Sequence, residues 1–259
     1  IYSTITPESS FTRSPSPQKG KEDGDRVAVT GSPATGLVVH LYVQGSTTVQ
    51  IAGRTVVVHQ ETRYPWEGQV NISFEMDGPT PFLLKLRNPG WCQHFHLRIN
   101  GNGERSVRSI KAPLQKGYHC LERVWEPGDT ITLEMEMPVE RVYAHPDVRQ
   151  NAGMVAIQRG PVVYCLEGMD NSVPLERIYL PQDAAGHVVP SLTPRFESDI
   201  LGGIVILQGQ ALAASTSDWG DSLYRPNPPQ FNPVHITAIP YFAWDNRQPG
   251  AMRVWLNQI

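Results

Sequence analysis

The sequence predicts an all-β protein, with two consecutive antiparallel β-sandwich domains of jelly-roll-like type after a disordered N-terminal segment. Apolar and polar residues alternate over residues 70–76 and again over 131–137, which is the period of a half-buried strand. The chain also holds 22 Gly and 23 Pro, and these residues divide it into short segments bounded by turns. No stretch has a helical period over a useful length, so we expect strands throughout.

The first sandwich is expected over residues 37–144. Its clearest strand is 131–137, where four apolar side chains alternate with Thr and Glu. An Asn-Pro-Gly turn at 88–90 separates two further alternating runs, as it would between antiparallel strands. The expected strands are 37–43, 47–51, 55–59, 70–76, 82–87, 95–99, 118–125 and 131–137.

The second sandwich is expected over residues 145–259, because the strand rhythm breaks around residues 143–147. Residues 217–233 hold several prolines and polar side chains, which is typical of a long surface loop. The expected strands are 154–158, 162–166, 204–207, 234–239 and 252–256.

The first 36 residues differ in composition from the rest. The segment 14–25 carries no apolar residue that could offset the entropy lost on ordering. We therefore interpret residues 1–36 as a flexible leader or linker.

Charge and cysteine content exclude several classes of protein. The net charge is −3 and the Lys and Arg residues are scattered, so we expect no nucleic-acid partner. No apolar run approaches the roughly 20 residues of a membrane-spanning helix, and no secretion signal is visible. We expect a soluble, cytoplasmic protein that binds no membrane. Three cysteines without C-x-x-C spacing indicate free, buried thiols rather than disulfides.

One group of residues has the spacing of a metal site. Cys92, His94 and His96 would share one face of an extended strand, and three such ligands can hold zinc with an open position. The opposite face carries Phe95 and Leu97, so the histidines would face water. Exposed histidines without a metal are therefore the favoured interpretation, and a metal-dependent hydrolase at this place is the least favoured function.

Aromatic residues in turns suggest a second kind of site. Trp219, Tyr241 and Trp244 are candidates for binding carbohydrate, because an aromatic ring offers a flat apolar face and polar edges. Trp219 lies in a polar loop, which leaves its role open. The alternative is that such rings close the ends of a sandwich.

Four motifs occur in order along the chain: QETRYPWEG at 60–68, LRNPGWC at 86–92, AIQRGPVVYCLE at 156–167 and IPYFAWDNR at 239–247. Together they resemble the C-terminal part of glycoside hydrolase family 127, the β-L-arabinofuranosidase family, across residues 37–259. The resemblance implies two β-sandwich domains that follow an N-terminal helical (α/α)6 barrel. In that family the catalytic cysteine, the zinc ligands and the acid/base glutamate belong to the barrel. It therefore implies no catalytic residue and no cofactor in this chain, with the zinc site in the barrel.

Two functions of different classes follow from these observations. The first is an accessory, non-catalytic part of a β-L-arabinofuranosidase-like enzyme, inactive alone, whose barrel hydrolyses terminal β-L-arabinofuranosyl residues. Its partners would be a catalytic barrel, in the same polypeptide or another chain, and a second copy in a homodimer. The alternative is a free-standing carbohydrate-binding protein that uses Trp219, Tyr241 or Trp244.

Overall fold

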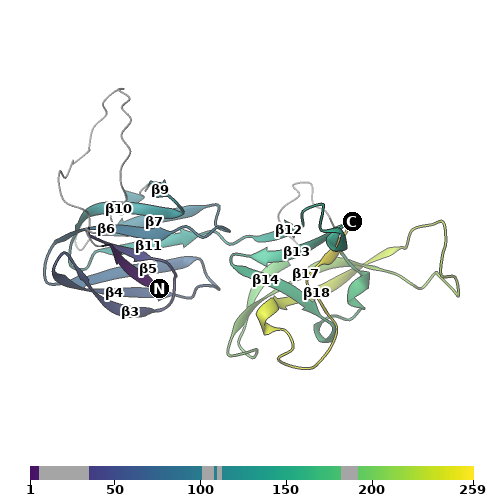
Figure 1. The fold of residues 1–259 in the computed structure, drawn as a ribbon. Coiled ribbons are helices and arrows are strands. Elements are labelled where there is room, and N and C mark those ends of the chain that lie inside the picture. Colours follow the sequence, from purple (N-terminus) through teal and green to yellow (C-terminus); the bar gives the residue numbers. More distant parts are fainter. Residues whose placement is uncertain (6–34, 101–107, 110–112, 182–191) are drawn as a thin grey trace, which may run out of the picture. The chain divides into compact units, whose positions relative to one another are not determined.

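A computed structural model describes residues 1–5, 35–100, 108–109, 113–181 and 192–259 (Figure 1). These residues form strands joined by turns and by short 3-10 segments, which confirms the all-β prediction. The chain separates into two compact units, Ile1–Met135 and Glu136–Ile259.

The first unit is a sandwich of two sheets. The five-stranded sheet has the order β1-β2-β6-β10-β9 and the six-stranded sheet has the order β3-β4-β5-β11-β7-β8. Neighbouring strands are antiparallel except β2 and β6, which are parallel. The strands are β1 (Tyr2–Ile5), β2 (Gly36–Val39), β3 (Gly45–Ile51), β4 (Arg54–Thr62), β5 (Gln69–Met76), β6 (Thr80–Arg87), β7 (Phe95–Asn100), β8 (Arg108–Ser109), β9 (Leu114–Gln115), β10 (Tyr118–Trp125) and β11 (Thr130–Met135).

The alternating side chains of these strands build the core between the two sheets. Val70, Ile72 and Phe74 of β5 are buried, while the residues between them turn outward. Trp125, at the end of β10, is fully buried and packs against Phe74 at 5.2 Å between ring centroids. The period-two pattern of the sequence is therefore the pattern of the packed core.

The second unit closes its sheet on itself. Strands pair around a ring in the order β13, β20, β15, β17, β18 and β14, and β14 pairs again with β13. β20, at the C-terminal end, pairs with β13 antiparallel and with β15 parallel, and this pairing closes the ring. The sandwich-like prediction is thereby refined to a closed barrel in this unit. The strands are β12 (Val139–Tyr143), β13 (Met154–Arg159), β14 (Val162–Glu167), β15 (Ile178–Leu180), β16 (Leu192–Glu197), β17 (Ile204–Ala214), β18 (Phe231–Pro240), β19 (Met252–Arg253) and β20 (Leu256–Gln258).

The domain limits differ from the predicted ones at two places. We placed the boundary after residue 144, but β12 pairs antiparallel with β13, so residues 139–143 belong to the second unit. The break in rhythm that suggested the boundary is the turn between these two strands. In the predicted leader, 1–36, β1 is a strand that pairs with β2, while residues 6–34 lie outside the described part.

Candidate functional site

The structure does not bring the three candidate metal ligands together. Cys92 is buried in the core of the first unit, and its thiol donates to the carbonyl oxygen of His94 at 3.3 Å. The side chains of His94 and His96 are exposed. Within the described residues no group of three His, Cys, Asp or Glu side chains could hold a metal ion.

Cysteines elsewhere do not supply a metal site either. Cys92, Cys120 and Cys165 form no disulfide, as the sequence predicted, and Cys120 is half-buried where a buried thiol was expected. Burial raises the pKa of the Cys120 thiol, and it raises that of Cys165 to about 12, with Glu167 and Asp170 nearby adding to the effect. The Cys165 thiol is therefore not an activated nucleophile at neutral pH. Among the described residues, none of the three cysteines belongs to a group of His, Cys, Asp or Glu side chains that could hold a metal ion.

Trp219 lies in the loop between β17 and β18, and one face of its ring is covered. The Arg225 guanidinium stacks over this ring at 4.2 Å from the centroid, and it also pairs with Asp218 at 2.8 Å. The loop extends away from the barrel (Figure 1) and carries Leu223 and Tyr224 with almost bare side chains. Trp219 thus uses one face of its ring to pack against Arg225 of its own loop.

Tyr241 and Trp244, by contrast, form an exposed pair. They lie on and directly after the 3-10 turn η5 (Tyr241–Ala243), which follows β18 at the opposite end from Trp219. The two ring planes differ by 8° and their centroids are 6.2 Å apart. The residues are 47% and 38% exposed. A strand such as β18 spans about 30 Å, so the structure joins Tyr241 with Trp244 and separates both from Trp219.

A charged cluster fixes the segment that carries this pair. Arg247 is held by the carboxylates of Glu167 and Asp170, while the backbone N–H of Asp245 donates to Glu167 Oε1 at 3.0 Å. Glu167 is buried at the end of β14. The pKa of the Arg247 guanidinium is raised above its usual value, first by its hydrogen bond with Asp170 and also by Glu167. The cluster anchors the chain just after the aromatic pair to β14.

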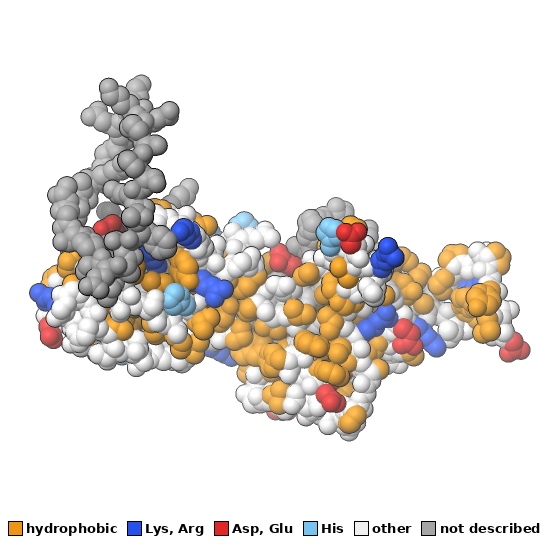
Figure 2. Space-filling model, viewed as in Figure 1, with side chains coloured by type: hydrophobic (Ala, Val, Ile, Leu, Met, Phe, Trp, Pro, Cys, Tyr) orange, Lys and Arg blue, Asp and Glu red, His pale blue; other side chains and the backbone are white. Residues whose placement is uncertain are grey.

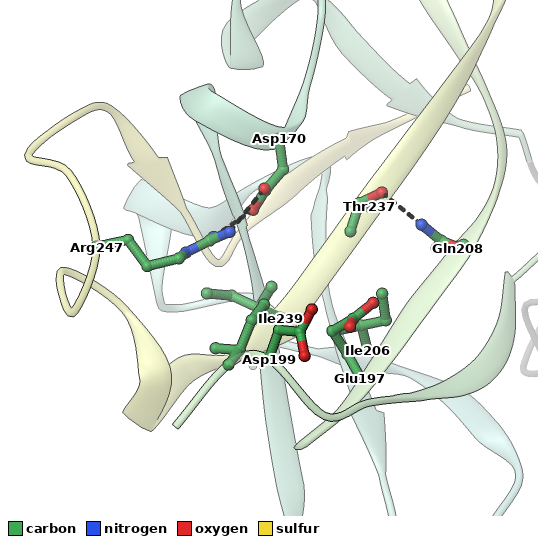
Figure 3. A pocket seen from close by; sticks show the side chains of 9 residues that line it. Asp170, Glu197, Asp199, Ile206, Gln208, Thr237, Ile239 and Arg247 are labelled. Carbon is green, nitrogen blue, oxygen red and sulfur yellow. Dashed lines mark hydrogen bonds and ion pairs between the residues drawn. The ribbon is translucent and has the colours of Figure 1, made fainter. Parts of the chain in front are cut away.

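A hollow of about 390 Å³ lies beside this cluster (Figure 3). Ile206 and Ile239 contribute apolar side chains to it, and Gln208 donates to Thr237 Oγ1 at 3.2 Å along its wall. Ile200 adds a third apolar side chain, and the remaining lining is charged and consists of Asp170, Glu197, Asp199 and Arg247. Ile239 and Arg247 flank the aromatic pair in sequence, so the hollow and the rings share one segment of chain.

Glu167 and Arg247 of the charged cluster lie in two of the sequence motifs, but the motifs alone did not predict that they meet. The two motifs end on Glu167 and on Arg247, and the pairing of Cys165 with Ile239 across β14 and β18 brings them together. The aromatic candidates were predicted, but the charged cluster and the hollow were missed. The presence of Glu167 and Arg247, two residues of opposite charge, at the ends of two separate motifs could have indicated the charged cluster.

The first unit offers a different kind of surface, on the outer face of its five-stranded sheet. The outward positions of the three central strands include Val38, Leu83, Cys120 and Val124. Cross-strand pairing places Val38 and Cys120 on either side of Lys85, and it places Pro81 opposite Val124. Val124 is 51% exposed. Lys85 and Glu122 also lie on this side of the sheet. We call Val38, Leu83, Cys120 and Val124, which surround these two charged residues, the apolar outer face.

The six-stranded sheet presents a polar outer face instead. Thr132 Oγ1 donates to Asn71 Oδ1 at 3.0 Å, His59 lies 3.1 Å from Glu75, and Arg98 pairs with Glu134. An antiparallel sheet with one polar face is typical of a sheet that is packed on one side and solvated on the other. The two sheets of the sandwich therefore differ in what their outer faces can contact.

The carboxylates of the charged cluster are not placed as the acid/base pair of a glycosidase. A glycosidase requires two carboxyl groups on either side of the bond, or an activated nucleophile. Glu167 and Asp170 are close together, but both are bound to Arg247.

No helix in the part of the chain that the structure describes is long and apolar enough to cross a membrane.

Two models of one family match the chain in succession. "Beta-L-arabinofuranosidase, GH127 middle domain" matches residues 36–137, and "Glycoside hydrolase family 127 C-terminal domain" matches residues 139–257. A curated relative, the non-reducing end β-L-arabinofuranosidase of Bifidobacterium longum subsp. longum, is 32% identical over 207 residues, which cover 77% of this chain and 30% of the relative.

Solved structures agree with these matches. A family 127 β-L-arabinofuranosidase from Geobacillus stearothermophilus is 45% identical with a TM-score of 0.79, over 86% of this chain and 34% of that one. A family 127 β-arabinofuranosidase is 28% identical with a TM-score of 0.74, over 86% of this chain and 35% of that one. The chain spans about a third of the length of the relatives it matches. With both domain models matched in order, the chain belongs to glycoside hydrolase family 127, of which it carries the middle and C-terminal domains.

Proposed function

We propose that this chain is the accessory, non-catalytic β part of a β-L-arabinofuranosidase-like enzyme. In this proposal, a helical (α/α)6 barrel, in the same polypeptide or in a partner chain, hydrolyses terminal β-L-arabinofuranosyl residues. The two β units brace that barrel and carry no catalytic group. The zinc and the catalytic cysteine are proposed to lie in the barrel, since no group of His, Cys, Asp or Glu side chains among the described residues could hold a metal ion.

The observation that carries the proposal is the apolar outer face of the five-stranded sheet. Val124 of β10 is 51% exposed and Leu83 of β6 is half-buried, so both side chains keep apolar surface in contact with water. Val124 and Leu83 would become fully covered if a second domain packed on this sheet. Each apolar side chain removed from water contributes about 1.5–3 kcal/mol when it is fully buried. Burial of the side chains of the apolar outer face would therefore favour a contact with a second domain.

The matched relatives give the proposal its chemistry. The curated relative is named as a non-reducing end β-L-arabinofuranosidase, and this chain corresponds to 30% of its length. Because this chain corresponds to only part of the relative, we assign the activity to a part of the enzyme other than these two units. The first test therefore measures whether this chain associates with a barrel.

The test is to co-express this chain with the (α/α)6 barrel of a family 127 relative and to measure both association and turnover. We expect a complex on size-exclusion chromatography, no hydrolysis of p-nitrophenyl β-L-arabinofuranoside by the chain alone, and hydrolysis by the complex. Turnover by the chain alone, or no association with a barrel whose fold is verified by circular dichroism, would contradict the proposal.

A pair of matched variants locates the contact. Val124→Lys puts a charge on the apolar outer face, and Thr48→Lys puts the same charge at an exposed position of β3 in the other sheet. We expect Val124→Lys to weaken association with the barrel at least tenfold and Thr48→Lys to leave it unchanged. Equal effects of the two variants would show that the barrel does not pack on the five-stranded sheet.

A further inference from the structure

We propose that Tyr241 and Trp244, together with the hollow that Ile239 and Arg247 of the same segment line, form a binding surface for a neutral carbohydrate chain in the second unit. This surface is separate from the apolar outer face of the first unit, and the inference does not depend on the accessory role proposed above. It rests on ring geometry, on the rigidity of the segment that carries the rings, and on the charge of the hollow.

The ring geometry suits a sugar. At 6.2 Å between centroids and 8° between planes, the rings are nearly parallel but offset, so part of each face stays open. The face of an aromatic ring carries the negative part of its quadrupole. The C–H groups on one side of a sugar ring are apolar and weakly positive, so they can lie flat against such a face. Hydrophobic side chains gather on the face of the second unit that Figure 2 shows. They lie where Figure 1, in the same view, places β14 and the turn after β18.

The segment that presents the rings is held in place before any ligand arrives. Ile239 is buried between β14 and β17, and Arg247 is bound by two carboxylates. Asp245 adopts a left-handed backbone conformation with φ of 60°, and its N–H is taken up by the buried Glu167. A site that is ordered in advance loses less entropy on binding. The rings therefore act as a fixed platform.

The hollow supplies the polar partners that hydroxyl groups require. Glu197, Asp199 and Gln208 offer oxygen acceptors along its wall, across from Asp170 and Arg247 (Figure 3). The lining contains three carboxylates and the guanidinium of Arg247, which already pairs with Asp170 and Glu167. Glu197 in turn lies 3.9 Å from Arg195. An anionic ligand would therefore meet carboxylates, while both of these guanidinium groups already have carboxylate partners. This charge balance selects a neutral sugar chain over a polyuronate.

The test is affinity electrophoresis of the purified chain in gels that contain linear arabinan, xylan or polygalacturonate, followed by calorimetric titration with oligosaccharides of any polymer that retards it. We expect retardation by at least one of the two neutral polymers and none by polygalacturonate. Trp244→Ala and Tyr241→Ala are each expected to weaken the titrated affinity at least tenfold.

Tyr224→Ala is the matched control, because Tyr224 is an exposed aromatic residue of the same unit at the far end of β18. It is expected to bind as the wild type does. Circular dichroism and thermal unfolding verify that each variant is folded. Three results would overturn the proposal: no retardation by either neutral polymer, a preference for polygalacturonate, or equal binding by Trp244→Ala and wild type. A Trp244→Ala variant that retains sugar binding and loses association with the barrel would show that the rings contact protein instead.

Discussion

The two units of this protein are stabilised in different ways. The first unit has an aromatic centre, in which Trp125 packs against Phe74 and Phe82 and the Arg123 guanidinium lies over the Trp125 ring at 5.0 Å from its centroid. The second unit adds a cluster of charges, Glu167, Asp170 and Arg247, that ties a loop to the end of a barrel strand. An apolar centre is stable because it is removed from water, whereas a buried charge is tolerated only while its partner is present. Loss of one residue should therefore have different consequences in the two units.

The largest effect is expected from Trp125→Ala in the aromatic centre. The side chain is fully buried, and its Nε1–H donates to the carbonyl oxygen of Phe82 at 3.2 Å. Removing it leaves a cavity and an unbonded carbonyl, which should lower the free energy of unfolding of the first unit by about 3–5 kcal/mol. Denaturant unfolding measures the loss, and hydrogen exchange assigns it to a unit. Trp125→Phe is the control and should cost less, since it keeps part of the ring volume. A loss under 1 kcal/mol would contradict the interpretation of Trp125 as the centre of the core.

A smaller loss is expected from Arg247→Ala in the charged cluster. The variant leaves the buried Glu167 without its guanidinium partner, which should cost about 2–4 kcal/mol, because Arg247 itself is partly exposed. The double variant Glu167→Gln with Arg247→Ala should recover a large part of this loss, since an amide carries no charge to compensate. Urea unfolding of the two variants, compared with wild type, measures the recovery. Additive losses would show that the two residues do not act as a pair.

The same contrast explains what the sequence could predict. The core of the first unit follows from alternation within single strands, so Val70, Ile72 and Phe74 were predictable as one buried face. The charged cluster joins residues about 80 positions apart, and its members show no local pattern. Closure of the barrel has the same cause, because β20 pairs with strands that are distant in sequence. The sequence predicted Tyr241 and Trp244 as candidate binding residues. It could not predict that their rings are parallel, because this depends on the turn η5 and its anchor at Glu167.

The smallest effect is expected at alkaline pH, from Cys165 beside the charged cluster. Its pKa in the folded state is raised from the usual thiol value of 9.0 to about 12 by burial, and also by Glu167 and Asp170. Between these values the folded protein holds the thiol proton more tightly than the unfolded chain does, so stability is full below pH 9 and falls as the pH rises above it. We expect the wild type to lose up to about 1 kcal/mol by pH 10 from this group, after allowance for solvent screening. In Cys165→Ala this slope should vanish, although the variant loses some packing at every pH. Thermal unfolding of both proteins from pH 7 to 10 measures the slopes. Parallel curves would show that the thiol proton is held no more tightly in the folded state, and that the neighbouring carboxylates are screened from it by their pairing with Arg247.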